Sequence, residues 1–254
     1  MTVHTNSCLN ALLSSPITYY RAVRIRKTNF GTKLMDKKRS IDVSEASRKS
    51  IVAFTVALNY SDVFRIALSS NAEQFEKWYV VTSPSNLSTL NFVNSYPNVE
   101  LVLFQFKNQY VKFNKGGALR KAQLIGYRNF PNSWYLNIDA DICLDESFTI
   151  WRRKLPSLDT DTLYGAKYRR DYAKMSDFRK KKGYEDYPHD NMIHGYFQLY
   201  AQKFLYNSSV DASWCDLEFG KCFSKHVLLK KFVCHHLGAR GNWDGTKGNG
   251  FLFD

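Results

Sequence analysis

Two aspartates separated by one residue, Asp139 and Asp141, follow the apolar run Trp134 to Ile138. That run is short and mostly apolar, which predicts a buried strand. Ligands of parallel sheets bind off the carboxyl ends of the strands, so both carboxylates are expected at a ligand crevice. Carboxylates this close repel each other unless a cation lies beside them, and oxygen ligands favour Mg²⁺ or Mn²⁺. The alternative is a role as turn or helix-capping residues, where Asp is common.

The end of the chain holds a second group of candidate ligands. They lie in Cys234-His235-His236-Leu237-Gly238, which is followed by Asn242-Trp243-Asp244-Gly245. A histidine that follows a strand-like run such as Val227 to Val233 can add a nitrogen ligand to a metal held by carboxylates. We expect His236 to have this role and His235 to be a buried core residue.

The elements that must position these residues alternate along the chain. Apolar runs predict strands at 51–58, 78–82, 99–104 and 134–138, and helices are expected between them, at about 61–70, 87–95 and 113–127. This alternation predicts an α/β fold with a mostly parallel sheet flanked by helices. The later part is less regular, with a basic stretch at 167–182, a strand-like run at 195–200 and a helix start near 211–219.

Length and composition exclude several classes of protein. The chain has 254 residues and is 44% hydrophobic, which excludes a disordered protein and a disulfide-stapled miniprotein. Its five cysteines form no CxxC pair, so we expect neither a zinc ribbon nor a disulfide framework, and we predict a reducing, cytoplasmic compartment. The apolar run 51–58 is far shorter than the ~20 residues of a membrane-spanning helix, and the N-terminus lacks the basic start of a signal peptide.

The net charge of +13, from 36 Lys and Arg against 23 Asp and Glu, indicates an anionic partner or a merely solvated basic enzyme. In the stretch 167–182, basic side chains alternate with tyrosines, which suits nucleic acid, an acidic glycan or a solvated rim.

Residues 1–50 are expected to be a basic extension ahead of a main domain at 51–254. The sequence has no GxGxxG after its first strand and no GxxxxGK[ST], which disfavours a dinucleotide oxidoreductase and a P-loop NTPase.

Several of these segments together carry a resemblance to a known family. Phe113-Asn114-Lys115-Gly116 and, further along, the run from Trp134 to Ile142 resemble the nucleotide-sugar-dependent glycosyltransferases of GT-A fold, in particular their small bacterial, phage or viral members. The agreement extends, in order, over about residues 51–247. It includes the segments 55–62, 80–83, 195–199 with Asp216, and the closing His236-Leu237-Gly238 with Asn242 to Gly245.

The resemblance implies a Rossmann-like GT-A fold, a UDP-sugar or other nucleotide-sugar donor, and Mn²⁺ or Mg²⁺. It makes Asp139, Asp141 and His236 the metal site, with Asp141 as the direct ligand. Asp139 would face the donor ribose or a metal-bound water.

The same resemblance implies a set of donor-binding residues. Asn59, Tyr60 and Thr82 are expected beside the base and ribose, together with Asp139. Lys115, at a helix start, is expected to reach the phosphates or the sugar, where a helix N-terminus adds its own positive field; the alternative is a solvated surface lysine.

Transfer to an acceptor hydroxyl calls for a carboxylate that removes its proton. Asp216 matches the late acidic position of inverting members of the family, and Glu218 is the second candidate. An enzyme that retains anomeric configuration needs no such base, and Asp216 is otherwise a helix-capping or solvated residue.

Three functions remain open from the sequence. The first is sugar transfer to a glycan. The second is transfer to a hydroxymethylated base of DNA, which the net charge of +13 favours. The third is a non-enzymatic, basic nucleic-acid-binding module, which the acids and His236 disfavour.

Overall fold

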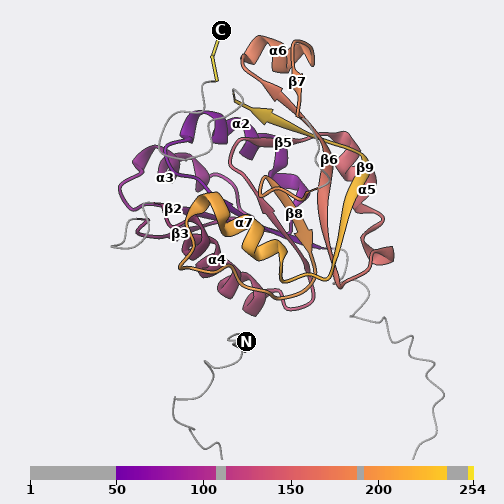
Figure 1. Ribbon diagram of the computed structural model, residues 1–254. Coiled ribbons are helices and arrows are strands. Elements are labelled where there is room, and N and C mark those ends of the chain that lie inside the picture. The colour runs from indigo at the N-terminus through magenta and orange to yellow at the C-terminus, as the bar shows by residue number, and fades with distance from the viewer. Residues whose placement is uncertain (1–49, 107–112, 188–191, 239–250) are drawn as a thin grey trace, which may run out of the picture. The chain divides into compact units, whose positions relative to one another are not determined.

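The computed structural model describes residues 50–106, 113–187, 192–238 and 251–254 (Figure 1). The described strands are β1 (Ile51–Val56), β2 (Lys77–Thr82), β3 (Val99–Leu103), β4 (Trp134–Ile138), β5 (Ile142–Leu144), β6 (Thr162–Tyr172), β7 (Glu185–Asp186), β8 (Phe197–Tyr200) and β9 (Lys225–Leu237). The α-helices are α2 (Ser61–Asn71), α3 (Leu87–Val93), α4 (Lys115–Asn129), α5 (Glu146–Arg152), α6 (Met175–Lys180) and α7 (Ala212–Gly220). Two short 3-10 helices, η1 (Ala72–Gln74) and η2 (Leu155–Ser157), follow α2 and α5.

The strands form one sheet in the order β3-β2-β1-β4-β8-β6-β9-β5, and β7 pairs with β6. Strands β3, β2, β1 and β4 are parallel neighbours, and β8 joins β4 antiparallel. Strand β9 runs parallel to β6 and antiparallel to β5. The predicted α/β fold, with a mixed, mostly parallel, Rossmann-like sheet flanked by helices, is confirmed.

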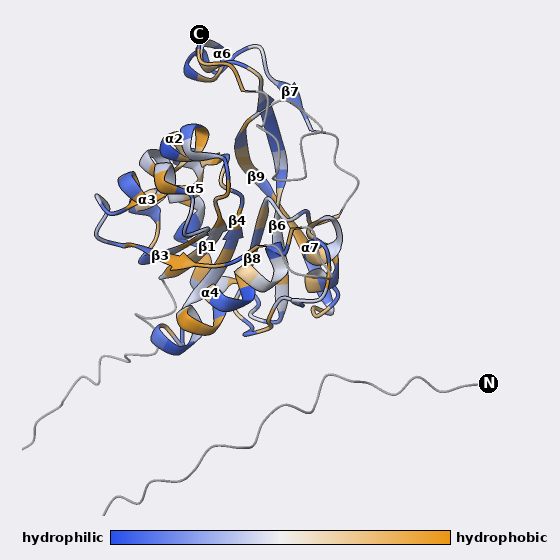
Figure 2. Cartoon of the chain, turned by 90° about the vertical axis from the view of Figure 1, so that its left-hand side faces the viewer, coloured by the Kyte–Doolittle hydropathy of each residue, from blue (hydrophilic) through white to orange (hydrophobic). Residues whose placement is uncertain are grey.

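Alternate residues of β1 pack into two different cores, because successive side chains of a strand point to opposite faces of the sheet. Ile51 and Ala53 belong to the core that contains Phe64 of α2. Val52 and Phe54 belong to the core that contains Leu119 of α4. Both faces of the central strands are therefore covered, and α4 shows the striped hydropathy of a helix buried on one side (Figure 2).

Most predicted elements lie within a few residues of their expected bounds, but the second half is more regular than the sequence indicates. Strand β6 occupies the start of the basic stretch 167–182, and α6 lies within it. Near its end β6 buries two charged side chains, Arg169 and Asp171, next to the exposed Tyr168 and the partly exposed Arg170, so no apolar alternation marks this half of the strand. Residues 1–49 and Asn242 to Gly245 lie outside the described residues.

Within the described ranges, Cys143, Cys215, Cys222 and Cys234 are free thiols. In the same ranges, every helix is too short or too polar to reach across a lipid bilayer.

Candidate active site

A cavity of about 570 Å³ opens where β1 and β4 end. Its lining includes six of the residues that the sequence singled out: Tyr60, Lys115, Asp139, Asp141, Asp216 and His236. They come from the loop after β1, the start of α4, the end of β4, α7 and β9. The position agrees with the rule that parallel sheets bind ligands at the carboxyl ends of their strands.

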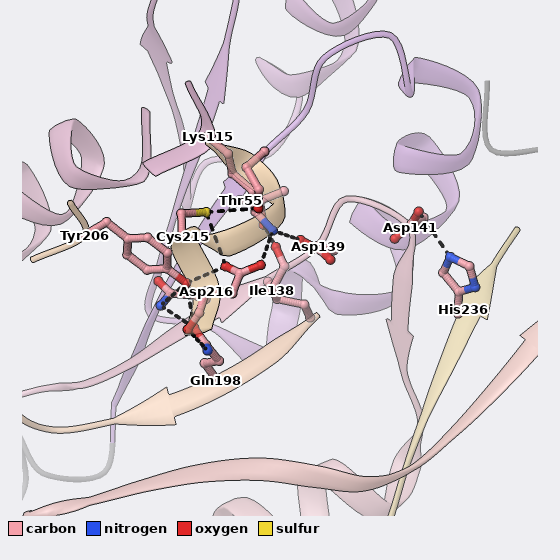
Figure 3. A network of polar contacts seen from close by, with 12 residues as sticks. Thr55, Lys115, Ile138, Asp139, Asp141, Gln198, Tyr206, Cys215, Asp216 and His236 are labelled. Atoms are coloured by element: carbon pink, nitrogen blue, oxygen red, sulfur yellow. Dashed lines mark hydrogen bonds and ion pairs between the residues drawn. The ribbon is translucent and has the colours of Figure 1, made fainter. Parts of the chain in front are cut away.

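Lys115 joins two of the carboxylates in this cavity (Figure 3). Its Nζ lies 3.0 Å from Asp139 Oδ1 and 3.0 Å from Asp216 Oδ2. Lys115 is the first residue of α4, whose start is fixed because the side chain of Asn114 accepts a hydrogen bond of 2.7 Å from the Gly117 amide. Burial alone would lower the pKa of Lys115, but Asp139 and Asp216 raise it well above its ordinary value. The side chain is therefore a fixed ammonium ion.

Asp216 is held on its other side by a buried tyrosine. Tyr206, which is fully buried, donates its hydroxyl to Asp216 Oδ1 at 2.8 Å. Gln198 on β8 donates to the backbone carbonyl of Asp216 at 3.2 Å. A Cβ atom at Gly195 would lie 1.8 Å from Asp216 Oδ2, so only glycine leaves room for the carboxylate there.

Asp139 and Asp141 have different partners although one residue separates them. Asp139 pairs with Lys115, whereas Asp141 Oδ2 lies 3.3 Å from His236 Nε2. Burial raises the pKa of Asp139, as do the nearby carboxylates Asp216 and Asp141, against the effect of Lys115. For Asp141 burial acts in the same direction, but His236 outweighs it and lowers the pKa.

Strand pairing brings His236 to Asp141 from far along the chain. In the sheet, His236 on β9 is opposite Ile142 on β5 and also opposite Asp171 on β6. The amide of Leu237 donates to the carbonyl of Asp141 at 2.8 Å, which fixes the β5–β9 register at this point.

The second ring nitrogen of His236 also has a carboxylate partner. His236 Nδ1 lies 3.1 Å from Asp171 Oδ1. Asp171 in turn accepts two hydrogen bonds from Arg169, of 2.8 and 3.1 Å. Burial opposes protonation of the ring, but the two carboxylates raise the pKa of His236 to about 9.

The donor atoms of Asp141 and His236 suit a divalent cation. Both side chains line the cavity, and a histidine oriented by a carboxylate on its other nitrogen is the usual arrangement of a metal-ligating imidazole. Over the part of the chain that the structure describes, no group of three or more His, Cys, Asp or Glu side chains is arranged to hold a metal ion. The pair nevertheless offers one oxygen and one nitrogen donor to the cavity, and Mg²⁺ or Mn²⁺ commonly takes the rest of its ligands from substrate phosphates and water.

The remaining donor-side candidates divide into two groups. Tyr60 is buried at the cavity wall, and Asn59 is exposed in the same loop with a φ of 60°. Thr82 is fully buried and is absent from the described cavity lining. Its hydroxyl donates to the Ala57 carbonyl at 2.7 Å and accepts from Asn86 Nδ2 at 3.0 Å. Thr82 thus anchors the loop that carries Asn59 and Tyr60.

Two further candidates lie away from the cavity. Glu218 is half-exposed on α7, where it pairs with Lys221, and the described lining does not include it. His235 is buried, and its Nδ1 lies 3.1 Å from the Tyr172 hydroxyl, as expected of a core histidine.

Three residues that support the site were not predicted from the sequence: Tyr206, Arg169 and Asp171. Tyr206 lies in the irregular segment after β8, where no periodic pattern of residues predicts that its side chain is buried beside Asp216. Arg169 and Asp171 are two residues apart on β6, so their side chains lie on the same face of the strand. Their opposite charges at this spacing, within a basic stretch, could have predicted the ion pair that they form.

Comparisons with protein-family models and with curated protein sequences give no match. Among solved structures, the chain is similar to 4-diphosphocytidyl-2C-methyl-D-erythritol synthase from Anaerococcus prevotii. The TM-score is 0.39 and the sequence identity 13%, over 74% of this chain and 90% of the other. A likeness this remote assigns no reaction to the present chain.

Proposed function

We propose that this protein is a metal-dependent glycosyltransferase that moves a sugar from a nucleotide diphosphate donor, a UDP-sugar, to a hydroxyl of a glycan. The observation that carries the proposal is the cavity at the ends of β1 and β4. At one side of it Asp141 and His236 lie together, 3.3 Å apart, and at the other side lies a separate, partly buried carboxylate, Asp216.

On the donor side, Asp141 and His236 would hold Mn²⁺ or Mg²⁺. When bound, that ion would stabilise the diphosphate as it leaves the sugar. Lys115 is a fixed ammonium at the N-terminus of α4, so it adds positive charge to the same wall of the cavity. Asp139 keeps Lys115 in place and faces the space where a donor ribose or a metal-bound water fits.

On the acceptor side, Asp216 is the base. Lys115 and Tyr206 each occupy one of its oxygens, at 3.0 and 2.8 Å. A carboxylate oxygen accepts more than one hydrogen bond, so an acceptor hydroxyl can approach Asp216 beside these partners and lose its proton to it. Asp216 is favoured over Glu218 because it lines the cavity and Glu218 pairs with Lys221 instead.

A second candidate function is transfer to a base of DNA. It is favoured by the basic and aromatic side chains of β6 and the following segment. Arg170 lies 4.3 Å from the Tyr184 ring, and Lys167 lies 5.6 Å from the Tyr168 ring. Cations beside aromatic rings suit phosphate contact with base stacking.

Donor binding and donor hydrolysis test the proposal. UDP with Mn²⁺ is expected to raise the melting temperature, because a ligand that binds only the folded state stabilises it, and EDTA is expected to abolish the shift. Asp141→Asn should lose the Mn²⁺-dependent shift and UDP-sugar hydrolysis, whereas Asp186→Asn, an exposed control on β7, should keep both. Absence of any Mn²⁺-dependent shift or hydrolysis with a panel of nucleotide sugars would contradict the proposal and favour a non-enzymatic module.

A further inference from the structure

Helix α7 carries a tryptophan that the core does not use. Trp214 is 63% exposed, yet it lines the same cavity as Asp216. The three other described tryptophans are buried in the core: Trp78, Trp134 and Trp151. An exposed indole at the mouth of a cavity is an aromatic surface available to a ligand.

The geometry of α7 places this indole and the proposed base on the two flanks of its cavity face. Cys215 and Phe219 face the core. Successive residues of an α-helix are about 100° apart, so Ser213 and Leu217 lie together on the cavity face, with Trp214 on one flank and Asp216 on the other. A ring held against this face meets the indole on one side and directs a hydroxyl toward Asp216 on the other.

Aromatic faces bind more than one class of flat ligand. The face of an indole is electron-rich and attracts the C–H groups of a sugar ring, and nucleobases also stack on it. The charges around Trp214 separate these two possibilities.

Among the described residues, the helix neighbours of Trp214 carry more negative than positive charge. Asp211 and Glu218 lie three residues before and four residues after it, so they are its neighbours on the helix surface. Lys221 is already paired with Glu218, and the cavity cations Lys115 and Arg169 are paired with carboxylates. Nucleic acid requires free cations for its phosphates, whereas an uncharged sugar requires none.

From these observations we propose that Trp214 forms the acceptor subsite and stacks on an uncharged sugar ring whose hydroxyl faces Asp216. The assignment of this subsite as the acceptor's rests on the proposed function, and it names the acceptor class as a neutral glycan. In this proposal the basic stretch 167–182 is not needed to bind the reacting sugar.

Equilibrium binding without turnover tests the subsite. The probes are the methyl glycosides of glucose, galactose and mannose and a single-stranded oligothymidylate, each titrated by ligand-observed NMR against the full chain with UDP and Mn²⁺ and without them. At least one glycoside is expected to bind, and Trp214→Ala should weaken it by about tenfold, the loss of roughly 1.4 kcal/mol of stacking. Trp214→Phe should restore much of the affinity. Ile150→Ala, which removes an equally exposed apolar side chain from α5, should bind as the unaltered protein does.

Three results would overturn the subsite: no binding of any of the glycosides, equal glycoside affinity in Trp214→Ala, or oligothymidylate binding that depends on Trp214. Circular dichroism of each variant separates lost binding from lost folding. The titrations with and without UDP and Mn²⁺ also separate this subsite from the proposed function. Glycoside binding through Trp214 without any nucleotide binding would support the sugar subsite and count against the proposed transferase. Nucleotide binding without glycoside binding would support the proposed transferase and contradict the sugar subsite.

Discussion

Two polar networks meet at the cavity, and they are built differently. One joins Lys115, Asp139, Asp216 and Tyr206, and it gathers the start of α4, the end of β4 and α7 around an ammonium ion. The other runs from Asp141 through His236 and Asp171 to Arg169, along the paired strands β5, β9 and β6. Figure 3 shows Asp139 and Asp141 directed into these two separate groups.

This difference separates two chemical tasks. A network centred on a fixed lysine leaves little reason for a second cation at Asp139. A network that presents a carboxylate oxygen beside an imidazole nitrogen favours a metal ion. We therefore propose metal binding on the Asp141 side and proton transfer on the Asp216 side, and each substitution below should affect one side only.

The largest expected effect is on the Asp216 side. Asp216→Asn should lower sugar transfer by about 10²- to 10⁴-fold, the usual contribution of a general base. Its donor hydrolysis should retain the Mn²⁺ dependence of the unaltered protein. Glu218→Gln on the same helix is the matched control and should transfer normally. Steady-state rates of the two variants check this, and equal losses in both would show that α7 matters only for folding.

The next largest effect is on the metal side. Asp171→Asn should weaken Mn²⁺ binding by about 10- to 100-fold, because Asp171 orients His236 without touching the ion. Calorimetric titration with Mn²⁺ measures the affinity. Asp177→Asn, an acidic residue of α6 outside the cavity lining, is the control. An unchanged affinity in Asp171→Asn would remove Asp171 from the metal network.

A smaller effect is expected at Tyr206. Tyr206→Phe leaves Asp216 Oδ1 and the buried Gln198 side chain without this hydroxyl, which should cost about 1–3 kcal/mol of stability. It should lower kcat more than KM, because it disturbs the base and not the donor wall. Denaturant unfolding and rates together check the prediction, and a variant with unchanged stability and kcat would exclude Tyr206 as a positioning residue.

The smallest expected effect is on stability in the absence of metal. The pKa of His236 is raised to about 9, above its unfolded value of about 6.5, so its stabilising charge is fully present below pH 6.5 and is lost as pH rises through 9. In EDTA the unfolding free energy should fall by about 1 kcal/mol per pH unit between pH 7 and 8 from this group. His236→Gln should show a flatter profile over that range. Parallel profiles for the two proteins would contradict the network around His236.

The sequence predicted the parts of this site that depend on local pattern. The apolar run Trp134 to Ile138 identified β4, and its end placed Asp139 and Asp141 at the cavity. Asp216 was preferred to Glu218 because of the family resemblance, and of the two it is Asp216 that lines the cavity. These predictions succeed because strand ends and helix starts are determined by neighbouring residues.

Other features depend on contacts between distant segments. The separation of Asp139 from Asp141 follows from the register of β9 against β5 and β6, which no local pattern encodes. Tyr206 and Trp214 gain their positions from the packing of the segment after β8 and of α7. The end of strand β6 was not predicted because its buried residues Arg169 and Asp171 are charged and pair with each other.

Mn²⁺ binding to two asparagine variants, Asp141→Asn and Asp139→Asn, distinguishes the roles of the two aspartates. Calorimetry with UDP present should show that Asp141→Asn loses more than about 100-fold in Mn²⁺ affinity. That loss exceeds the usual cost of removing a residue that only orients a metal ligand. Asp139→Asn should bind Mn²⁺ within a few-fold of the unaltered protein, because Asp139 pairs with Lys115. Equal losses in both variants would contradict the division of the two aspartates between separate networks.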